Sequence, residues 1–366
     1  MSVREVDAHD RRELDRFIRM ERELIGDQPL YAGEQLDTDV RKRLSGQSEF
    51  SQEMSWALFV TDRARCAAIV SPRWQRTHDE PQTGSIGYFA AGPGAAGEVE
   101  ELLGAAEEWL AARGMTRVVA PFNGSAVLGA AARTDAFDES PMFPFSWNPP
   151  YYEEYLTTAG YERRYPLWYY DIDFSSERYR EASRRAFADP QAEIRQVDKR
   201  RWREEAELGR VLLNEGFADE WEFHALTFEE YWEFVKPQKA FTDPRLSLVA
   251  EVDGEPAGLT FAMKDLTPAF RAARGRLGPL KLVRLVRTVR RPGRIGLLAI
   301  ALRPKFRGRR IGALLAATLW RNIEEMGYGG SSYYVVNDHN VASRGLAESF
   351  GGEGRVLYHC YDKRLD

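Results

Sequence analysis

An internal repeat is the feature of this 366-residue sequence that most constrains its fold. The segments LLGAAEEWLAARGMTRVVAPFN (102–123) and LLAATLWRNIEEMGYGGSSYYVVN (314–337) share one order of elements. Each has a helical pattern, a glycine that ends the helix, a β-rich run and then an asparagine, Asn123 or Asn337. Repetition of a helix–strand unit indicates a duplicated architecture. The sequence therefore predicts two similar halves.

The length and the order of elements agree with this prediction. A chain of this length exceeds what one compact core usually covers. Helical and β-rich patterns alternate in both halves, so we expect a fold of the α/β class in the broad sense, that is, α+β with a mixed sheet. The last expected element of each half is a helix, near 150–159 and at 341–350. We predict one domain at residues 1–173, a helical linker at 174–192 and a second domain at 193–366.

Composition and charge limit the class of protein. Hydrophobic residues make up 43% and charged residues 29%, which is ordinary for a globular chain. No apolar run approaches the roughly 18 residues of a membrane span, and the N-terminus has no apolar leader. We therefore expect a cytoplasmic protein without a membrane span. The formal net charge of −5 argues against general affinity for nucleic acid.

The charge is unevenly distributed, because Arg271 to Arg310 contains fourteen Lys or Arg residues and no Asp or Glu. Within it, GPLKLVRLVRTVRR has leucines and valines near one helical face and arginines opposite. Three interpretations stay open: a packed amphipathic helix with a solvated basic face, a lid that attracts phosphates, or contact with a membrane surface or RNA.

The stretch LRPKFRGRRIGALL (302–315) leads from an expected strand, 296–302, into an expected helix, 311–326. Free backbone N–H groups and the helix dipole at such a junction favour an anion. Glycines allow close approach to a diphosphate, and arginines add charge-assisted hydrogen bonds. Taken alone, the stretch also fits a basic surface turn.

Two motifs give the second half its resemblance to a known family. The acetyl-CoA loop of the GNAT acetyltransferase superfamily has the motif Q/R-x-x-G-x-G/A. Arg307 and Gly312 match its first and last positions, and Arg310 stands at the position of the middle glycine. Val336-Asn337, Asn340 and Ser343 match a second motif, V-N-x-x-N-x-x-A/S. The chain thus resembles a tandem GNAT protein with a degenerate first copy.

The resemblance implies an acyl-CoA-dependent N-acyltransferase, and an N-acetyltransferase in the first instance. The co-substrate would be acetyl-CoA or another acyl-CoA, and a small-molecule or peptide amine would attack the thioester directly. We expect the cofactor-binding residues to be Ala301, Leu302, Arg303, Arg307, Gly308, Arg309, Arg310, Ile311, Gly312, Asn340 and Ser343.

Two departures from the family pattern bear on this prediction. Arg310 stands where the loop usually has a glycine, and we expect it to be tolerated if its φ stays negative. Ala347 stands where many members have a tyrosine that protonates the leaving thiolate. Asp338 and His339 lie beside Asn340 and are the candidate general bases, although such residues also cap helices.

The first half has its own glycine-rich loop, Gly92 to Gly97, which satisfies G-x-G-x-x-G. A dinucleotide-binding fold would have an acidic residue about 20 positions further on, and the chain has Thr116-Arg117 there. We reject that fold. Aligned by the repeat, Gly97 corresponds to Arg310 and Gly94 to Arg307, so this loop lacks the arginine and is expected to be degenerate.

Further alternatives remain open at this level. The aromatic segment FPFSWNPPYYEEY (143–155) fits either a substrate pocket between the domains or a rigid packed turn. The five histidines have no metal-binding spacing, so we expect no metal. A transferase that uses aminoacyl-tRNA is the first rival, since such enzymes are also duplicated GNAT-like folds and the basic segment suits tRNA. The second is a non-catalytic acyl-CoA-binding protein.

Overall fold

The computed structural model describes residues 1–366 except 1, 34, 143–144, 241, 276–292 and 366. The elements of the first half are β1 (Arg4–Val6), α1 (Arg11–Ile25), α2 (Asp37–Leu44), β2 (Ser55–Val60), β3 (Ala64–Val70), α3 (Pro72–His78), β4 (Thr83–Ala91), α4 (Ala96–Ala111), β5 (Arg117–Ala120), β6 (Ala132–Arg133), α5 (Tyr151–Thr158) and β7 (Glu162–Asp173). Those of the second half are α6 (Glu177–Ala188), β8 (Glu193–Gln196), α7 (Trp202–Gly216), α8 (Phe228–Val235), β9 (Ser247–Val252), β10 (Glu255–Lys264), α9 (Thr267–Ala273), β11 (Ile295–Leu302), α11 (Ile311–Glu325), β12 (Gly330–Asn337), α12 (Val341–Ser349) and β13 (Glu353–Arg364).

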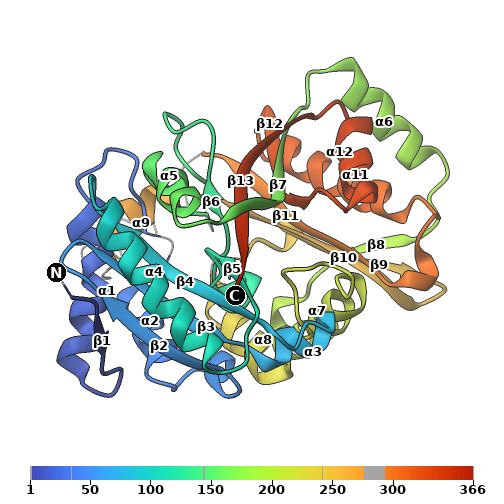
Figure 1. Cartoon of the computed structure of the whole chain (residues 1–366). Helices are drawn as coiled ribbons and strands as arrows, with labels where there is room; N and C mark the ends of the chain where they lie inside the picture. Colours follow the sequence, from blue (N-terminus) through green and yellow to red (C-terminus); the bar gives the residue numbers. More distant parts are fainter. Residues whose placement is uncertain (1, 34, 143–144, 241, 276–292, 366) are drawn as a thin grey trace.

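All described strands belong to one mixed sheet, which runs β1-β2-β3-β4-β5-β13-β7-β12-β11-β10-β9-β8, with β6 paired to β13. The first five strands and the last five have the same internal order, and in each set the fourth and fifth strands are parallel. Figure 1 shows the two sets on either side of β7 and β13. The α/β class with a mixed sheet and the two similar halves are confirmed.

The last strand of each half crosses into the sheet of the other half. β7 pairs with β12 from Gly330↔Asp173 to Asn337↔Leu167, and β13 pairs with β5 from Tyr361↔Ala120 to Arg364↔Arg117. The two exchanged strands also pair with each other, antiparallel, along most of their length. Each half therefore depends on the other for the strand that completes its sheet.

The sequence patterns did not predict β7 or β13. Pro166 argues against a central strand because it removes a ladder hydrogen bond. In the structure Pro166 lies opposite His359 at a shift in register, and the adjacent Tyr165 has φ +47°. The irregularity accommodates the proline, so the strand continues.

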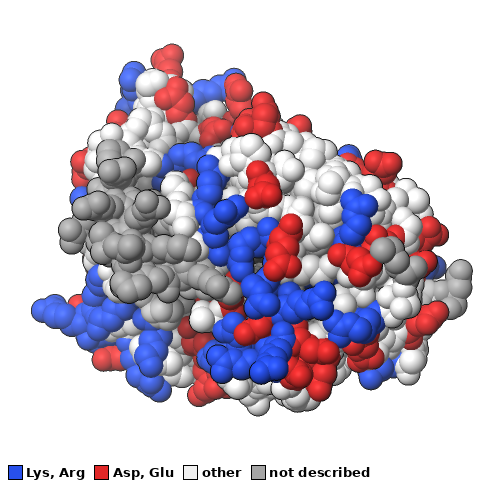
Figure 2. All heavy atoms as spheres, turned by 90° about the vertical axis from the view of Figure 1, so that its left-hand side faces the viewer, with Lys and Arg blue, Asp and Glu red and all other residues white. Residues whose placement is uncertain are grey.

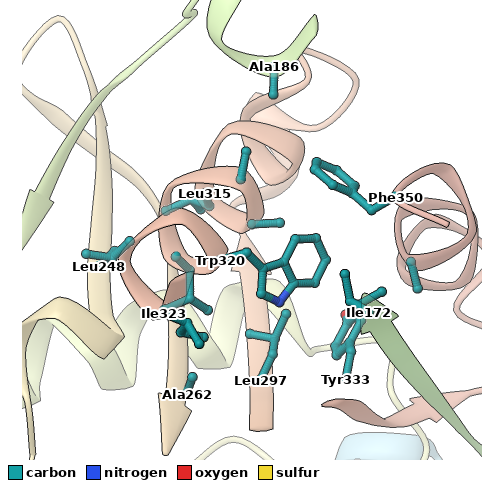
Figure 3. Close-up of a cluster of buried hydrophobic side chains, with 14 of the residues drawn as sticks. Ile172, Ala186, Leu248, Ala262, Leu297, Leu315, Trp320, Ile323, Tyr333 and Phe350 are labelled. Carbon is teal, nitrogen blue, oxygen red and sulfur yellow. The ribbon is translucent and has the colours of Figure 1, made fainter. Parts of the chain in front are cut away.

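Helices cover the sheet of the second half on both faces (Figure 1). On one face, α6, α11 and α12 enclose the core around Trp320, whose side chain is completely buried. Figure 3 shows Trp320 among Leu315, Ile323, Leu297 and Phe350. α7 packs on the other face, against β10 and β11.

The segment predicted as a linker, 174–192, contains α6. Its N-cap is Ser176, whose side chain accepts a hydrogen bond from the backbone N–H of Tyr179. Tyr179, Ala182 and Ala186 are buried in the core of the second half. The domain limits at 173 and 193 stay a proposal.

Much of the basic segment, residues 276–292, lies outside the described residues. Arginines on either side of it contact the first half: Arg271 donates to Ser140 Oγ at 2.9 Å, and Arg294 donates to the carbonyl oxygen of Pro141 at 2.6 Å. Figure 2 shows Lys and Arg gathered with Asp and Glu among them. On α1 and α2, for example, Arg41 pairs with Asp15 at 2.6 Å. Arg271 and Arg294 therefore tie the two halves together.

Candidate active site

β11 and β12 separate after a short parallel contact. They pair at Gly296↔Ser332 and Leu297↔Tyr333, whereas residues 298–302 pair only with β10 among the described strands. The register of β12 against β7 shifts between Tyr334 and Val336, close to this divergence. Alternate backbone groups of β11 are therefore open to a ligand on the side that β12 has left.

The basic loop joins the end of β11 to the start of α11, in the predicted position. No described side chain caps α11, so the first backbone N–H groups of the helix remain available. Arg310, the N-cap, has φ +57°, and Gly308 has φ +79°. The expected negative φ at Arg310 is therefore wrong: the chain adopts the left-handed conformation there although it has no glycine.

The two loops differ in length. Four residues, 92–95, separate β4 from α4, whereas eight residues, 303–310, separate β11 from α11. Gly97 is the second residue of α4, as Gly312 is of α11, and Ala95 is the N-cap equivalent to Arg310. The pattern of the sequence did not reveal this difference in length because the repeat is defined by the helices and strands that follow the loops.

Several predicted loop residues already have protein partners. Arg307 contacts Asp219 Oδ2 at 3.3 Å and the carbonyl oxygen of Gly216 at 3.1 Å. Arg310 contacts Asp189 Oδ2 at 3.2 Å.

Arg303 binds Glu215 through two nitrogens at 2.8 Å, and the Arg309 guanidinium lies 5.6 Å from the centroid of the Phe306 ring. Ala301 and Ile311 are buried, and Leu302 lies at the end of β11. The loop therefore offers its backbone, with guanidinium groups at its rim.

Asn340 and Ser343 meet at the start of α12, as predicted. Asn340 Oδ1 accepts a hydrogen bond from the backbone N–H of Ser343 at 3.0 Å, and this capping leaves the Asn340 amide nitrogen for another partner. Both residues line a cavity of about 310 Å³, which also contacts Tyr333 and Ala299. The predicted residues of β11 and α12 therefore meet at the divergence of the strands.

Two carboxylates that the sequence analysis did not single out lie in the same place. The Asn337 amide nitrogen donates to Glu222, and to Glu220 Oε2 at 3.1 Å. The Asn340 amide nitrogen donates to Glu220 Oε1 at 2.5 Å, and Trp221 Nε1 donates to Asn337 Oδ1 at 2.7 Å. The asparagines of the second motif thus fix a pair of carboxylates that come from the loop between α7 and α8.

The environment of these carboxylates changes their protonation. Burial, and secondly the nearby charge of Glu220, raise the pKa of Glu222 to about 7. Burial also raises the pKa of Glu220, while its hydrogen bonds from Asn337 and Asn340 oppose that effect. A carboxylate with a pKa near neutrality can both accept and release a proton. The signal in the sequence was small, two glutamates among aromatic residues in 220–223.

Asp338 and His339 lie elsewhere. The Asp338 carboxylate accepts hydrogen bonds from Trp168 Nε1 at 2.9 Å and from Arg344 at 2.6 Å. The side chain of His339 is exposed, and neither residue lines the cavity. This placement gives no support to a proton-transfer role for the two residues.

The corresponding divergence in the first half is filled by tyrosines of α5. Tyr152 Oη accepts from the backbone N–H of Ala91 at 3.0 Å, and Tyr155 Oη accepts from that of Ala95 at 2.9 Å. Tyr155 also donates to the carbonyl oxygen of Gly92 at 3.0 Å. Both rings are buried. The backbone groups that a ligand would use here are already satisfied by the protein.

The aromatic segment 143–155 therefore has more than one role. Residues 143–144 lie outside the described residues, Phe145 lines the large cavity, and the tyrosines of α5 pack in the first half. Within the described ranges, no group of three or more His, Cys, Asp or Glu residues could hold a metal ion. None of the helices in those ranges is long and apolar enough to cross a membrane.

Comparison with known proteins agrees with this geometry. Residues 210–351 match the family model "Acetyltransferase (GNAT) family". Over 274 residues the chain is 29% identical to "Bacterial ceramide synthase" of Caulobacter vibrioides, covering 72% of this chain and 71% of the relative. It is 22% identical over 378 residues to "Protein YghO" of Escherichia coli, covering 97% and 94%.

Solved structures give the same fold. A tandem GNAT protein from the clavulanic acid biosynthesis pathway aligns with a TM-score of 0.53 at 11% identity, covering 99% of this chain and 98% of that one. A probable N-acyltransferase from Enterococcus faecalis aligns with a TM-score of 0.50 at 11% identity, covering 99% and 71%.

Proposed function

We propose that the second half of this chain, whose residues 210–351 match the GNAT family model and which has the fold of tandem GNAT proteins, transfers an acyl group from CoA to an amine. The single observation that carries the proposal is the meeting, at one opening in the sheet, of the open edge of β11, the uncapped start of α11, the half-buried Glu220 and the buried Glu222.

The donor would bind along the loop and the open edge of β11. Backbone N–H groups from Arg307 to Gly312 would hold the diphosphate, helped by the dipole of α11. A Cβ at Gly312 would lie 3.5 Å from Leu302, an ordinary contact, so the protein's own packing does not require glycine there. Close approach of a phosphate to the backbone would require a glycine at position 312. The backbone of Ala301 to Arg303 would hold the pantetheine arm.

Glu222 would act as the general base. The amine nitrogen attacks the thioester carbonyl carbon, its proton passes to Glu222, and the carbon–sulfur bond breaks to release the thiolate of CoA. Holding the amine and the thioester together supplies much of the acceleration. Tyr333, near Ser343, keeps its proton because burial raises its pKa to about 12. Its hydroxyl can therefore donate a hydrogen bond to the leaving sulfur.

The name of the Caulobacter relative suggests the class of acceptor. A ceramide is a long-chain amino alcohol whose nitrogen bears a fatty acyl group. We therefore propose that the acceptor is the primary amine of an amphiphilic amino alcohol.

Steady-state kinetics of Glu222→Gln tests the assignment. Purified full-length protein is supplied with acyl-CoA and the amino alcohol sphinganine, and the amide product and released thiol are measured. The neutral isostere can still accept the hydrogen bond from Asn337, so we expect kcat to fall by about 10²- to 10⁴-fold with little change in the binding of CoA. Glu229→Gln, an exposed glutamate on α8, is the matched control and should retain activity.

Failure would be clear. If the intact protein bound neither CoA nor any acyl-CoA in calorimetry, the donor assignment would be wrong. If Glu222→Gln retained full kcat while the wild type was active, the base would be another group.

A further inference from the structure

The 310 Å³ cavity is larger than an acetyl group needs. Beyond the opening in the sheet it continues beneath α7 and α8, and side chains of β9 and β10 form its floor. The walls are mostly apolar, and they include Leu213, Leu226, Val249 and Leu259. A space of this kind in the structure fits an occupant that is itself apolar and long.

α7 gives the direction and the length of the cavity. Trp202, Ala206, Gly209 and Leu213 line it and lie at helical spacing on one side of the helix. A rise of about 1.5 Å per residue makes this row about 16 Å long. The C-terminal end of α7 packs on the end of β11, where a Cβ at Gly216 would lie 2.7 Å from the Cβ of Ala301.

Leu213 therefore marks the end near the open edge of β11, and Trp202 marks the distant end. The indole of Trp202 is fixed there, because its Nε1 donates to the carbonyl oxygen of Val235 in α8 at 3.3 Å. With carbon–carbon bonds of about 1.5 Å, an extended chain advances about 1.3 Å per carbon, so the row accommodates about a dozen carbons.

We propose that this cavity binds the acyl chain of the donor, that the enzyme is selective for long-chain acyl-CoA, and that Ala206 and Trp202 set the chain length. The inference rests on the proposed function. Three observations favour the donor's chain over the acceptor's. The cavity begins at Leu298 to Ile300, the part of β11 beside which the thioester would lie. Nearly all of its wall comes from the half that has the phosphate loop. Its far end, at Trp202, lies about 16 Å along α7 from Leu213, a distance that suits a fatty acyl chain.

The expected donor is therefore a fatty acyl-CoA. Each methylene buried against such a wall adds about fourfold to affinity, so acetyl-CoA would bind much more weakly than dodecanoyl-CoA. Small side chains on α7 keep the middle of the cavity open. At Gly209 a Cβ would lie 2.8 Å from Tyr231 Oη, so the close packing of α8 on α7 requires a glycine there. Ala206 already has a Cβ and lines the cavity, so it is the better position to vary.

The test compares kcat/KM for acetyl-, octanoyl-, dodecanoyl- and hexadecanoyl-CoA with sphinganine as the acceptor. Ala206→Phe should remove room for about three methylenes and lower kcat/KM for dodecanoyl-CoA by on the order of 50-fold, while the value for octanoyl-CoA changes little. Trp202→Ala should shift the preference toward longer chains. Glu204→Phe, which adds the same ring to the exposed side of α7, is the control.

A binding measurement separates this inference from the proposed function. Calorimetry with CoA and the acyl-CoA series needs no acceptor, and dodecanoic acid alone can probe the cavity in each variant. Tighter binding with each added methylene, weakened by Ala206→Phe and not by Glu204→Phe, supports the inference even if no amide forms.

Two results would overturn it. An affinity for acyl-CoA that does not depend on chain length would mean that the acyl chain lies outside the cavity, although the donor loop would stand. A change in preference among acceptor amines of different chain length in Ala206→Phe, with acyl preference unchanged, would mean that the acceptor occupies it.

Discussion

Both halves have the same order of elements, and each has an opening where its fourth and fifth strands, which are parallel, separate. Side chains of the protein fill the opening in the first half but not the one in the second half. In the first half, Tyr152 and Tyr155 supply the partners of the backbone N–H groups of Ala91 and Ala95. In the second half, no tyrosine among the described residues caps the start of α11, and a cavity reaches the opening between β11 and β12. A duplicated fold therefore conserves the opening, while its occupant is decided by a few side chains.

Loop length adds to this difference. The first half connects strand to helix with four residues and the second with eight, so only the second has a basic turn before the helix. The cavity beside the first opening is also smaller, about 80 Å³ against about 310 Å³. We infer that donor binding belongs to the second half.

The largest effect is expected from substitutions at the second residue of α11, compared with the second residue of α4. Gly312→Asp together with Arg307→Ala should weaken binding of CoA by about 100-fold or more, because a carboxylate would lie against the diphosphate and a charge-assisted contact would be lost. Gly97→Asp, at the equivalent place in α4, meets no neighbour within 4 Å and should leave affinity unchanged. Calorimetric titration measures both. Loss of affinity in Gly97→Asp would show that the first half binds as well.

The next effect is a dependence on pH that only the second half can supply. With the pKa of Glu222 raised to about 7, kcat at saturating acceptor should fall about tenfold per pH unit below 7 and level off above it. Glu222→Gln should lack this rising limb.

The contribution of Glu222 to folding stability changes with pH in the direction opposite to activity. A folded-state pKa above the usual value of about 4.5 means that the folded protein retains a proton which the unfolded chain has lost. The contribution of Glu222 to stability therefore falls as pH rises from 4.5 to 7, and Glu222→Gln should be relatively more stable above pH 7 than below 4.5. Urea denaturation at several pH values measures this. A wild-type profile without that trend would contradict the raised pKa.

A smaller effect concerns the tyrosines that fill the first half. Tyr152→Phe and Tyr155→Phe would each leave a buried backbone N–H without its partner, which costs about 1–3 kcal/mol of unfolding free energy. Thermal or urea denaturation detects a loss of this size, and binding of CoA should not change. Tyr151→Phe is a milder control, because the Tyr151 ring is only partly buried and donates one hydrogen bond, at 3.2 Å. An unchanged midpoint in both variants would mean that water replaces the hydroxyls.

The smallest effect compares the two N-caps. Ala95 has φ −97°, whereas Arg310 has φ +57°, so relief of the left-handed strain by Arg310→Gly should offset the loss of an exposed ion pair with Asp189. We expect a change in unfolding free energy of less than about 1 kcal/mol, toward greater stability, as measured by urea denaturation. A clear loss would show that the Asp189 contact matters more than the backbone.

Local patterns predicted much of the second half. The helical periodicity and the glycines and proline in 302–315 predicted the junction of β11 and α11. The asparagine motif predicted the start of α12. Such signals are local, because a helix N-terminus and its flanking strand are specified within about fifteen residues. The same reasoning could not reveal Glu222, since its pKa depends on burial against segments far away in the sequence.

What the sequence by itself determined is the duplication, the mixed α/β class and the position of the basic loop between β11 and α11, because these depend on periodicity and spacing. The tertiary structure alone decided that β7 and β13 exchange partners, that tyrosines of α5 fill the first opening, and that Glu220 and Glu222 lie at the second. The physical reason is pairing at long range. The partner of β7 in β12 lies some 165 residues further along the chain, and no local pattern identifies which strand edge or which opening a segment will complete.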